Sequence, residues 1–267
     1  MDSCLYKKIF SIFIFFLGKK NSSVIFMKYS ILEDPRYRHI AEPKSILFQI
    51  FSFLFDLYAN TVLTFYTPVK VIGRENIPKD QPFIFVSNHN SHMDIAILAY
   101  ATRMGYEKFG FLAAKDYWFD NSFRRRFFKN LINLIPISRK QNPESLDLED
   151  TITLSKAFMD LGNNIIIFPE GSRGEAGKMQ RFRKGAVKFS MGLNVPILPS
   201  AIVGTEKAWP KGKKWMQPVP ITVKILPIIH PKDSSNLSKT DQNKLLSETT
   251  NELEKKIIKA VKDLEKT

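Results

Sequence analysis

Short apolar runs rich in β-branched residues alternate with helical segments from residue 69 onward, and this alternation restricts the fold of the 267-residue chain more than any other feature. The runs with the length and composition of strands lie at 70–73, 82–86, 164–168, 196–203 and 221–229. Helical segments between strands are typical of parallel pairing, because such a connection needs about a dozen residues or more. We therefore predict an α/β fold with a mixed, largely parallel sheet covered by helices.

Two helices are predicted around these strands. One covers 95–101, and the other covers 240–266, where apolar residues recur at helical spacing among many charged ones. A chain of this length that is 44% hydrophobic can build one sizeable core with an accessory segment. We assign that core to a single α/β domain at residues 69–267.

Residues 1–68 are predicted to form an N-terminal helical segment associated with a membrane. The stretch 46–66 is rich in Phe and Leu but contains Gln49, Asp56 and Asn60. A charge exposed to lipid at mid-membrane is costly, so we expect a helix or helical hairpin in the interface rather than a simple spanning helix. The flanking basic residues, which suit an anionic bilayer surface, are Arg36, Arg38, Lys44 and Lys70. The alternative is an ordinary buried helix that packs on the core.

The beginning of the chain leaves a choice open. An apolar run at 9–17 lies between lysine pairs and has about the length of a signal-peptide core, but no small-residue cleavage site follows it. The run is also shorter than the roughly 20 apolar residues that a spanning helix needs. Either Met1 or Met27 could be the initiator.

The charge of the chain requires an anionic partner. The sequence has 40 Lys and Arg residues against 26 Asp and Glu, which gives a formal net charge of +14 at pH 7. Phosphate headgroups, nucleic acid or an acidic carrier protein would each suit such a charge. The single cysteine, Cys4, excludes an intrachain disulfide and a cysteine-rich metal site, which favours a cytosol-facing protein.

A polar cluster, Ser-Asn-His-Asn-Ser-His-Met-Asp at 87–94, directly follows the predicted strand at 82–86. Strand ends of open α/β sheets are where sites tend to be built. On one regular helix His89 and Asp94 would lie about 140° apart, so they meet only if His89 sits in a turn before the helix. Asp94 would then hold one imidazole nitrogen and leave the other free to take a proton. The arrangement would be a Ser-His-Asp triad in which a substrate hydroxyl replaces the serine.

A second polar turn, Phe-Pro-Glu-Gly-Ser-Arg, follows the predicted strand at 164–168. It would bring the carboxylate of Glu170, the open backbone of Gly171 and the guanidinium of Arg173 to the sheet edge. Arginine is suited to bidentate phosphate binding. Alone, this motif is also compatible with a Pro-Gly turn that carries a surface ion pair.

Two further cations stand near predicted strands. Arg139 follows a strand-like apolar run at 133–137, and Lys184 belongs to the sequence Phe-Arg-Lys-Gly at 182–185. Either side chain could contact a phosphate, and either alone could be a solvated surface charge.

In this order the motifs resemble those of the glycerolipid acyltransferase family, which includes the 1-acylglycerol-3-phosphate acyltransferases. The resemblance covers roughly residues 70 to 230. Its blocks are His-x4-Asp at 88–94, the run ending at Arg139, Phe-Pro-Glu-Gly at 168–173 and Val-Pro-Ile at 195–199. Ser172 stands where threonine is commoner, and Asn133 replaces the glycine that usually begins the Arg block. The first change keeps a hydroxyl, and the second is expected to alter the acceptor pocket.

The resemblance implies transfer of a fatty acyl group from acyl-CoA or acyl carrier protein to the free hydroxyl of a lysophospholipid, above all lysophosphatidate, which becomes phosphatidate. It implies that His89 is the general base and that Asp94 holds it. The substrate-binding residues that it implies are Arg139, Glu170, Gly171, Arg173 and Lys184. No metal and no cofactor besides the acyl donor is expected. The expected partners are membrane lipids rather than nucleic acid, at the cytoplasmic face of a membrane.

Other interpretations fit less well. The segment from Gly171 to Lys178 resembles a phosphate-binding loop, but its glycines are separated by five residues rather than four, and Met179 replaces the Mg²⁺-binding Ser or Thr. The sequence has neither the Gly-x-Ser-x-Gly elbow of a serine hydrolase nor a His-Glu-x-x-His zinc motif. His92 is expected to be structural or to line the substrate site. The open alternatives are glycerol-3-phosphate or another lysophospholipid as acceptor, and a non-catalytic basic protein that binds membranes or nucleic acid.

Overall fold

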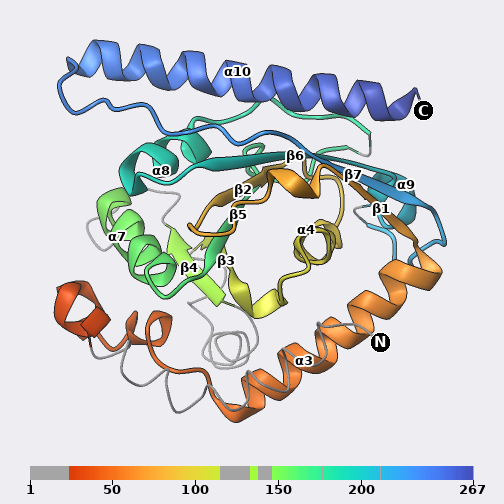
Figure 1. Ribbon diagram of the computed structural model, residues 1–267, viewed down its shortest axis with the longest axis horizontal. Coiled ribbons are helices and arrows are strands. Elements are labelled where there is room, and N and C mark those ends of the chain that lie inside the picture. The colour runs from red at the N-terminus through yellow and green to blue at the C-terminus, as the bar shows by residue number, and fades with distance from the viewer. Residues whose placement is uncertain (1–23, 115–132, 138–145, 176, 211, 267) are drawn as a thin grey trace. The chain divides into compact units, whose positions relative to one another are not determined.

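The computed structural model describes residues 24–114, 133–137, 146–175, 177–210 and 212–266, and Figure 1 shows the course of the chain. Contacts divide the chain into two compact units. One consists of Met1–Ser52 and Glu107–Asn163, and the other of Phe53–Tyr106 and Asn164–Thr267. This division is based on contacts in space, whereas the boundary after residue 68 was predicted from the sequence pattern. That boundary stays a prediction.

The unit that contains the C-terminus is built on strands in the order β1-β7-β6-β2-β5. They are β1 (Val69–Ile72), β2 (Ile84–Ser87), β5 (Asn164–Ile167), β6 (Ile197–Val203) and β7 (Ile221–Ile225). Strand β2 pairs in parallel with β5 and with β6, and β1 pairs in parallel with β7, while β6 and β7 are antiparallel. The predicted α/β fold with a mixed, largely parallel sheet is confirmed.

The helices of this unit cover both faces of these strands. They are α4 (Asp94–Thr102), α8 (Gly185–Leu193), the short α9 (Thr205–Ala208) and α10 (Lys239–Glu265). Helix α10 packs on β6 and α8, and Figure 1 shows it on the opposite side of the strands from α4. The buried side chains of α10 lie on one face of the helix, and they are Thr249, Thr250, Leu253, Ile257 and Ala260. Both predicted helices are confirmed.

The burial of the strand residues reflects the helices that pack on both faces of the strands. Strands β2 and β5 are buried at every position, as expected for strands with helices on both faces, whereas β7 alternates between buried and half-buried residues. The prediction of a strand over 221–229 is too long, because β7 ends at Ile225. Pro227 cannot donate a ladder hydrogen bond, and the chain rejoins β6 only through an isolated bridge between Ile229 and Ile197.

The other unit contains the parallel strands β3 (Phe109–Ala114) and β4 (Asn133–Ile137), with α7 (Leu148–Met159) packed on β4. The amide of Asn133 donates to the carbonyl oxygen of Glu107 at 2.7 Å, so this side chain joins the beginnings of the two strands. That contact gives the side chain of Asn133 a structural role. Short 3₁₀ turns in the chain lie at Ser30–Glu33, Arg38–Ile40, Arg74–Asn76 and Tyr106–Lys108.

The apolar stretch at 46–66 forms one continuous helix, α3 (Ile46–Thr61), which ends in a π-helical turn at Val62–Tyr66. By length and composition Ile46–Tyr66 could cross a membrane, and it is the one such helix among the described residues. Ser52 and Asp56 are buried, while Asn60 and Thr61 donate side-chain hydrogen bonds to carbonyl oxygens of the helix. Asp56 is 7% exposed and accepts a hydrogen bond from the backbone N–H of Tyr106 at 3.1 Å.

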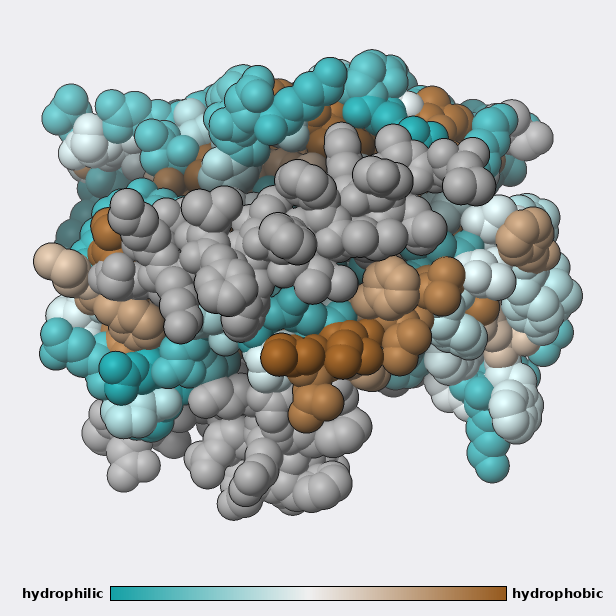
Figure 2. Space-filling model, turned by 60° about the horizontal axis from the view of Figure 1, so that its bottom comes forward, coloured by the Kyte–Doolittle hydropathy of each residue, from teal (hydrophilic) through white to brown (hydrophobic). Residues whose placement is uncertain are grey.

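Large apolar side chains cover the outer face of α3. Figure 2 shows a brown band of hydrophobic residues on this side of the molecule. The exposed residues are Ile46, Leu47, Ile50, Phe51, Phe53, Leu54, Leu57 and Tyr58, followed by Phe65 and Tyr66 in the π-helical turn. Phe48 and Leu63 are buried, but most of the large apolar side chains are exposed while the one carboxylate, Asp56, is buried. A helix that packs on a core by its apolar face has the opposite arrangement.

Candidate active site

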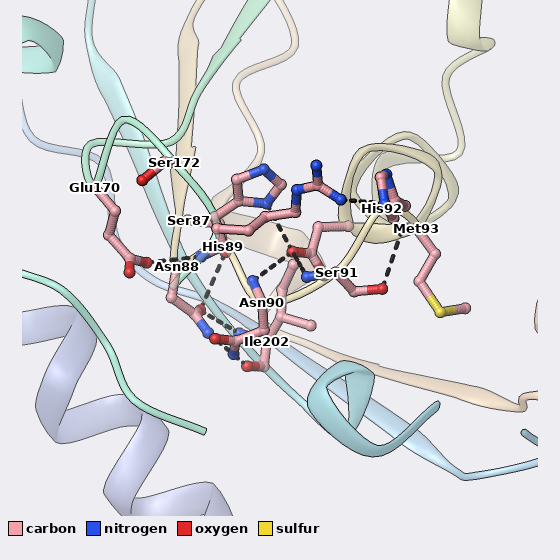
Figure 3. Close-up of polar contacts among 12 residues, drawn as sticks. Ser87, Asn88, His89, Asn90, Ser91, His92, Met93, Glu170, Ser172 and Ile202 are labelled. Carbon is pink, nitrogen blue, oxygen red and sulfur yellow. Dashed lines mark hydrogen bonds and ion pairs between the residues drawn. The ribbon is translucent and has the colours of Figure 1, made fainter. Parts of the chain in front are cut away.

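The ends of β2 and β5 place two polar segments at one edge of the sheet. Val86 pairs with Ile167 in parallel register, so the chain leaves both strands at the same level. The polar segment 87–94 begins at the last residue of β2 and ends at the first residue of α4, and the segment after β5 is 168–173. The two polar turns therefore lie together, as predicted, and Figure 3 shows the hydrogen bonds that join them.

His89 and Asp94 make the predicted contact. His89 lies in the turn before α4, and Asp94 is the first residue of that helix. Nδ1 of His89 lies 2.9 Å from Oδ2 of Asp94, whose side chain is fully buried. A carboxylate accepts hydrogen bonds, so Nδ1 carries the imidazole proton and Nε2 keeps its lone pair. The pair therefore presents a base at Nε2.

The Asp94 carboxylate is fixed independently of the histidine. Its Oδ2 atom also accepts hydrogen bonds from the backbone N–H groups of Asn90 and Ser91, both at 2.8 Å. Its Oδ1 atom is buried and has no hydrogen-bond partner among the described residues. Three donors converge on one oxygen, which determines the rotamer of Asp94 before any substrate is bound.

The ring of His89 is held from a second direction. It stacks on Phe168, with ring centroids 3.9 Å apart and planes inclined by 13°. The side chain is 15% exposed, so the imidazole remains open on part of its surface. Phe168 and Asp94 together restrict both the tilt and the rotation of the ring, which is the pre-organisation that a general base needs.

Glu170 holds the backbone on which His89 sits. Its Oε1 accepts the N–H of His89 at 2.7 Å, and its Oε2 accepts the N–H of Gln180 at 2.8 Å. The residue is 1% exposed. Burial raises the pKa of this carboxyl, while the hydrogen bonds from the backbones of Gln180 and His89 lower it. The geometry thus gives Glu170 a positioning role, and its predicted contact with the acceptor stays a prediction.

Asn88 is a further positioning residue, which the sequence did not single out. Its side-chain amide donates to the carbonyl oxygen of Ile202 and accepts from the N–H of the same residue, both at 2.8 Å. The side chain of Asn88 therefore makes the two backbone hydrogen bonds at the end of β6 that a neighbouring strand would otherwise make. Ser91 likewise donates its hydroxyl hydrogen to the carbonyl oxygen of Trp209 at 2.6 Å. The sequence signal for Asn88 and Ser91 was their polar character in a turn between two apolar segments.

Gly171 allows the second turn to close. Its N–H donates to the carbonyl oxygen of Phe168 at 3.0 Å, and its φ of +76° lies in the left-handed region that favours glycine. A Cβ atom at this position would lie 3.0 Å from Nε of Arg183. The structure thus brings Arg183 against the turn, although the sequence pointed to its neighbour Lys184.

The remaining predicted binding residues have different positions. Arg173 lies in the second turn, and its Nη1 donates to Nε2 of His92. Lys184 directly precedes α8 and has an exposed side chain. Arg139 lies outside the described residues. The substrate contacts of all three stay predictions.

A metal site was not expected from the sequence. Among the described residues, no three His, Cys, Asp or Glu side chains are grouped so that they could hold a metal ion. The expectation that the reaction needs no metal and no cofactor besides the acyl donor stays a prediction.

Comparison with known families identifies the region that contains this site. A family model described as Acyltransferase matches residues 68–203, just over half of the 267 residues. The matched region contains both polar turns and the His89 and Asp94 pair.

Individual relatives agree with the family match. A 1-acyl-sn-glycerol-3-phosphate acyltransferase of Limnanthes douglasii is 31% identical over 166 residues, which are 62% of this chain and 56% of that protein. An enzyme of the same name from Borreliella burgdorferi is 27% identical over 191 residues, which are 70% of each chain. The chain spans little more than half the length of the plant relative.

A solved structure is similar over nearly the whole chain. The crystal structure of the 1-acyl-sn-glycerophosphate acyltransferase PlsC from Thermotoga maritima has a TM-score of 0.54 and 25% sequence identity. The similarity covers 94% of this chain and 93% of that chain.

Proposed function

Because this chain belongs to the acyltransferase family, we propose that it transfers a fatty acyl group from a thioester donor to the free hydroxyl of lysophosphatidate and so forms phosphatidate. The donor is acyl-CoA or acyl carrier protein, and the product belongs to phospholipid biosynthesis. One observation carries the proposal: a buried carboxylate holds Nδ1 of His89 at 2.9 Å and leaves Nε2 available as a base. The printed activity of the relatives supports lysophosphatidate as the acceptor.

The proposed step is a direct transfer between substrates. Nε2 of His89 removes the proton of the acceptor hydroxyl while that oxygen attacks the carbonyl carbon of the thioester. Asp94 stabilises the imidazolium that forms. The tetrahedral intermediate then loses its C–S bond, and the leaving thiolate takes the proton from the imidazolium. The ester C–O bond remains, and His89 returns to its starting state.

The cations of the site suit an acceptor that carries a phosphate. Arg173 lies in the turn that Glu170 joins to His89, so its guanidinium and the base belong to one polar cluster. Arginine can bind phosphate in a bidentate manner, which would fix the acceptor at a set distance from Nε2. Lys184 and Arg139 are proposed as additional phosphate contacts.

The test is acyl transfer by the purified protein in detergent micelles. Radiolabelled lysophosphatidate, lysophosphatidylcholine and glycerol-3-phosphate are each supplied with acyl-CoA and, separately, with acyl carrier protein. We expect label in phosphatidate with at least one donor. Transfer to another acceptor alone would keep the mechanism and replace the substrate. A folded protein that acylates none of the three with either donor would contradict the proposal and favour a non-catalytic binding protein.

We also propose that α3 binds a membrane through its exposed apolar face. Leu47 and Leu54 are seven residues apart, so they lie on one side of the helix, and they are 77% and 55% exposed. An enzyme with a lysolipid acceptor requires such contact, since the acceptor resides in a bilayer. We place the protein at the cytoplasmic face, where anionic lipids would attract its net positive charge.

The variant Leu47→Asp/Leu54→Asp is expected to bind vesicles about 100-fold more weakly, because burial of two leucine side chains contributes about 3 kcal/mol. Flotation with vesicles of phosphatidylcholine and phosphatidylglycerol measures this partition. Leu237→Asp is the matched control, because Leu237 is 39% exposed and lies outside α3. Equal binding of the double variant and the wild type would contradict the role of α3.

A further inference from the structure

His92 lies in the same turn as His89, between β2 and α4, and neither the proposed proton transfer nor the predicted binding residues use it. Its Nε2 faces Nη1 of Arg173, as Figure 3 shows by the dashed line at the His92 ring. The residue is exposed at the surface of the site. A second histidine on the guanidinium expected to bind the acceptor is a feature of the site that needs a chemical reason.

The contact defines the protonation state of His92. A guanidinium has N–H donors, no acceptor, and stays charged, so Nε2 of His92 has to accept with its lone pair. The ring is therefore neutral and carries its proton on Nδ1. Partial burial, followed by the electrostatic effects of Arg173 and His89, lowers the pKa of His92, against an opposing effect of Asp94.

The surroundings of His92 fix its place. Its ring lies 5.9 Å from that of Trp209, at an inclination of 48°. The neighbouring Ser91 donates to the carbonyl oxygen of Trp209 at 2.6 Å and forms an isolated bridge with Pro210. The groups that face the imidazole are thus Arg173 from the turn after β5, Trp209 from the segment after α9, and His89 and Asp94 from its own segment.

On this basis we propose that His92 is a positioning residue, whose neutral imidazole holds the guanidinium of Arg173 in place to receive the phosphate of the acceptor. The proposal rests on the proposed function. An arginine side chain that is ordered before binding loses less rotamer entropy when the acceptor arrives. Since one of its donors is directed to His92, the other N–H groups remain for phosphate oxygens.

Two isosteric variants separate this role from general packing. The side-chain carbonyl of glutamine reaches the position of Nε2, whereas that of asparagine reaches only the position of Nδ1. We expect His92→Asn to raise KM for lysophosphatidate about 3- to 10-fold with kcat nearly unchanged, and His92→Gln to restore the wild-type value. A fall in kcat with KM unchanged, or equal behaviour of the two variants, would overturn the proposal.

The dependence of KM on pH gives a second readout. Below neutrality His92 takes up a proton, loses its acceptor and repels Arg173, so KM for lysophosphatidate in the wild type should rise as the pH falls from 7 to 5. The rise should be smaller in His92→Gln, because glutamine does not titrate in this range, whereas protonation of the acceptor phosphate acts on both proteins. An identical rise in both proteins would assign the effect to another group and contradict the role of His92.

Nuclear magnetic resonance tests the contact without any turnover, which separates its failure from that of the proposed function. The chain has 4 histidines, and the His92 signals can be assigned by their loss in His92→Gln. We expect the ¹⁵N shifts of a neutral ring protonated at Nδ1 in the wild type. Arg173→Met removes both a donor and a positive charge, so the titration midpoint of His92 should move to higher pH. A midpoint that does not move would overturn the contact even in an active enzyme.

Discussion

His89→Ala is expected to lower kcat for acyl transfer about 10³-fold, within the range of 10²- to 10⁴-fold that general bases contribute. The substitution removes Nε2, the group proposed to take the proton of the acceptor. Asp94 and Glu170 would keep their backbone contacts with Asn90, Ser91 and Gln180, so the turn itself should persist. Initial rates with saturating lysophosphatidate measure the effect, and thermal unfolding shows whether the variant is folded.

The matched control for this substitution is His230→Ala. His230 is exposed and follows β7, away from the two polar turns in sequence, and it should leave the rate unchanged. The alanine variant leaves space beside Phe168 where the imidazole ring was stacked. Added imidazole should therefore restore part of the activity with a saturable dependence on its concentration. A His89→Ala protein within about threefold of the wild-type rate would exclude His89 as the base.

The architecture of the site was predictable because strands and turns leave strong local patterns. The predicted runs at 82–86 and 164–168 are largely apolar, and the polar turns at 87–94 and 169–173 follow them. Parallel strands end at the same edge of a sheet, which predicts that both polar turns lie at that edge. The direct pairing of β2 with β5 came from the structure. The contact of His89 with Asp94 was predicted on the condition that His89 lies in a turn before the helix, and the structure has that turn.

The roles of particular side chains were less predictable, because they depend on partners distant in sequence. Glu170 was predicted to bind the acceptor. Its side chain is buried, and its two oxygens accept hydrogen bonds from the backbone N–H groups of His89 and Gln180. The acceptor for the amide of Asn88 is 114 residues away, at Ile202. Register between strands decides such pairs, and a single sequence does not contain it.

Element boundaries depend on packing in the same way. Strand β3 and helix α7 were not predicted from the sequence. Their packing explains why residue 110 in β3 is a glycine. A Cβ atom there would approach Cε1 of Phe158 in α7 to 2.7 Å, so the glycine allows close contact between the two elements. Nothing in the local sequence distinguishes such a glycine from one in a turn.

Asp94→Asn is expected to lower kcat for acyl transfer by about 10- to 10³-fold while leaving the fold intact, because the imidazolium loses the stabilisation of a neighbouring negative charge. Asn90 and Ser91 both donate backbone N–H groups to Oδ2, so the new side chain should turn its carbonyl oxygen toward them. Its NH₂ group then takes the place of Oδ1, which is buried without a hydrogen-bond partner among the described residues. His89 would keep its tautomer and lose the negative charge that stabilises its protonated form.

This orientation of the new side chain in Asp94→Asn predicts a kinetic effect that a loss of structure would not produce. Because Nε2 stays free in Asp94→Asn, KM for lysophosphatidate should remain close to the wild-type value, and the defect should lie in kcat. Asp233→Asn, at an exposed position, is the matched control and should have neither effect. A rise in KM with normal kcat would show that Asp94 acts on substrate binding. Wild-type values for both constants would mean that the imidazolium needs no carboxylate and would contradict the proposed role of Asp94.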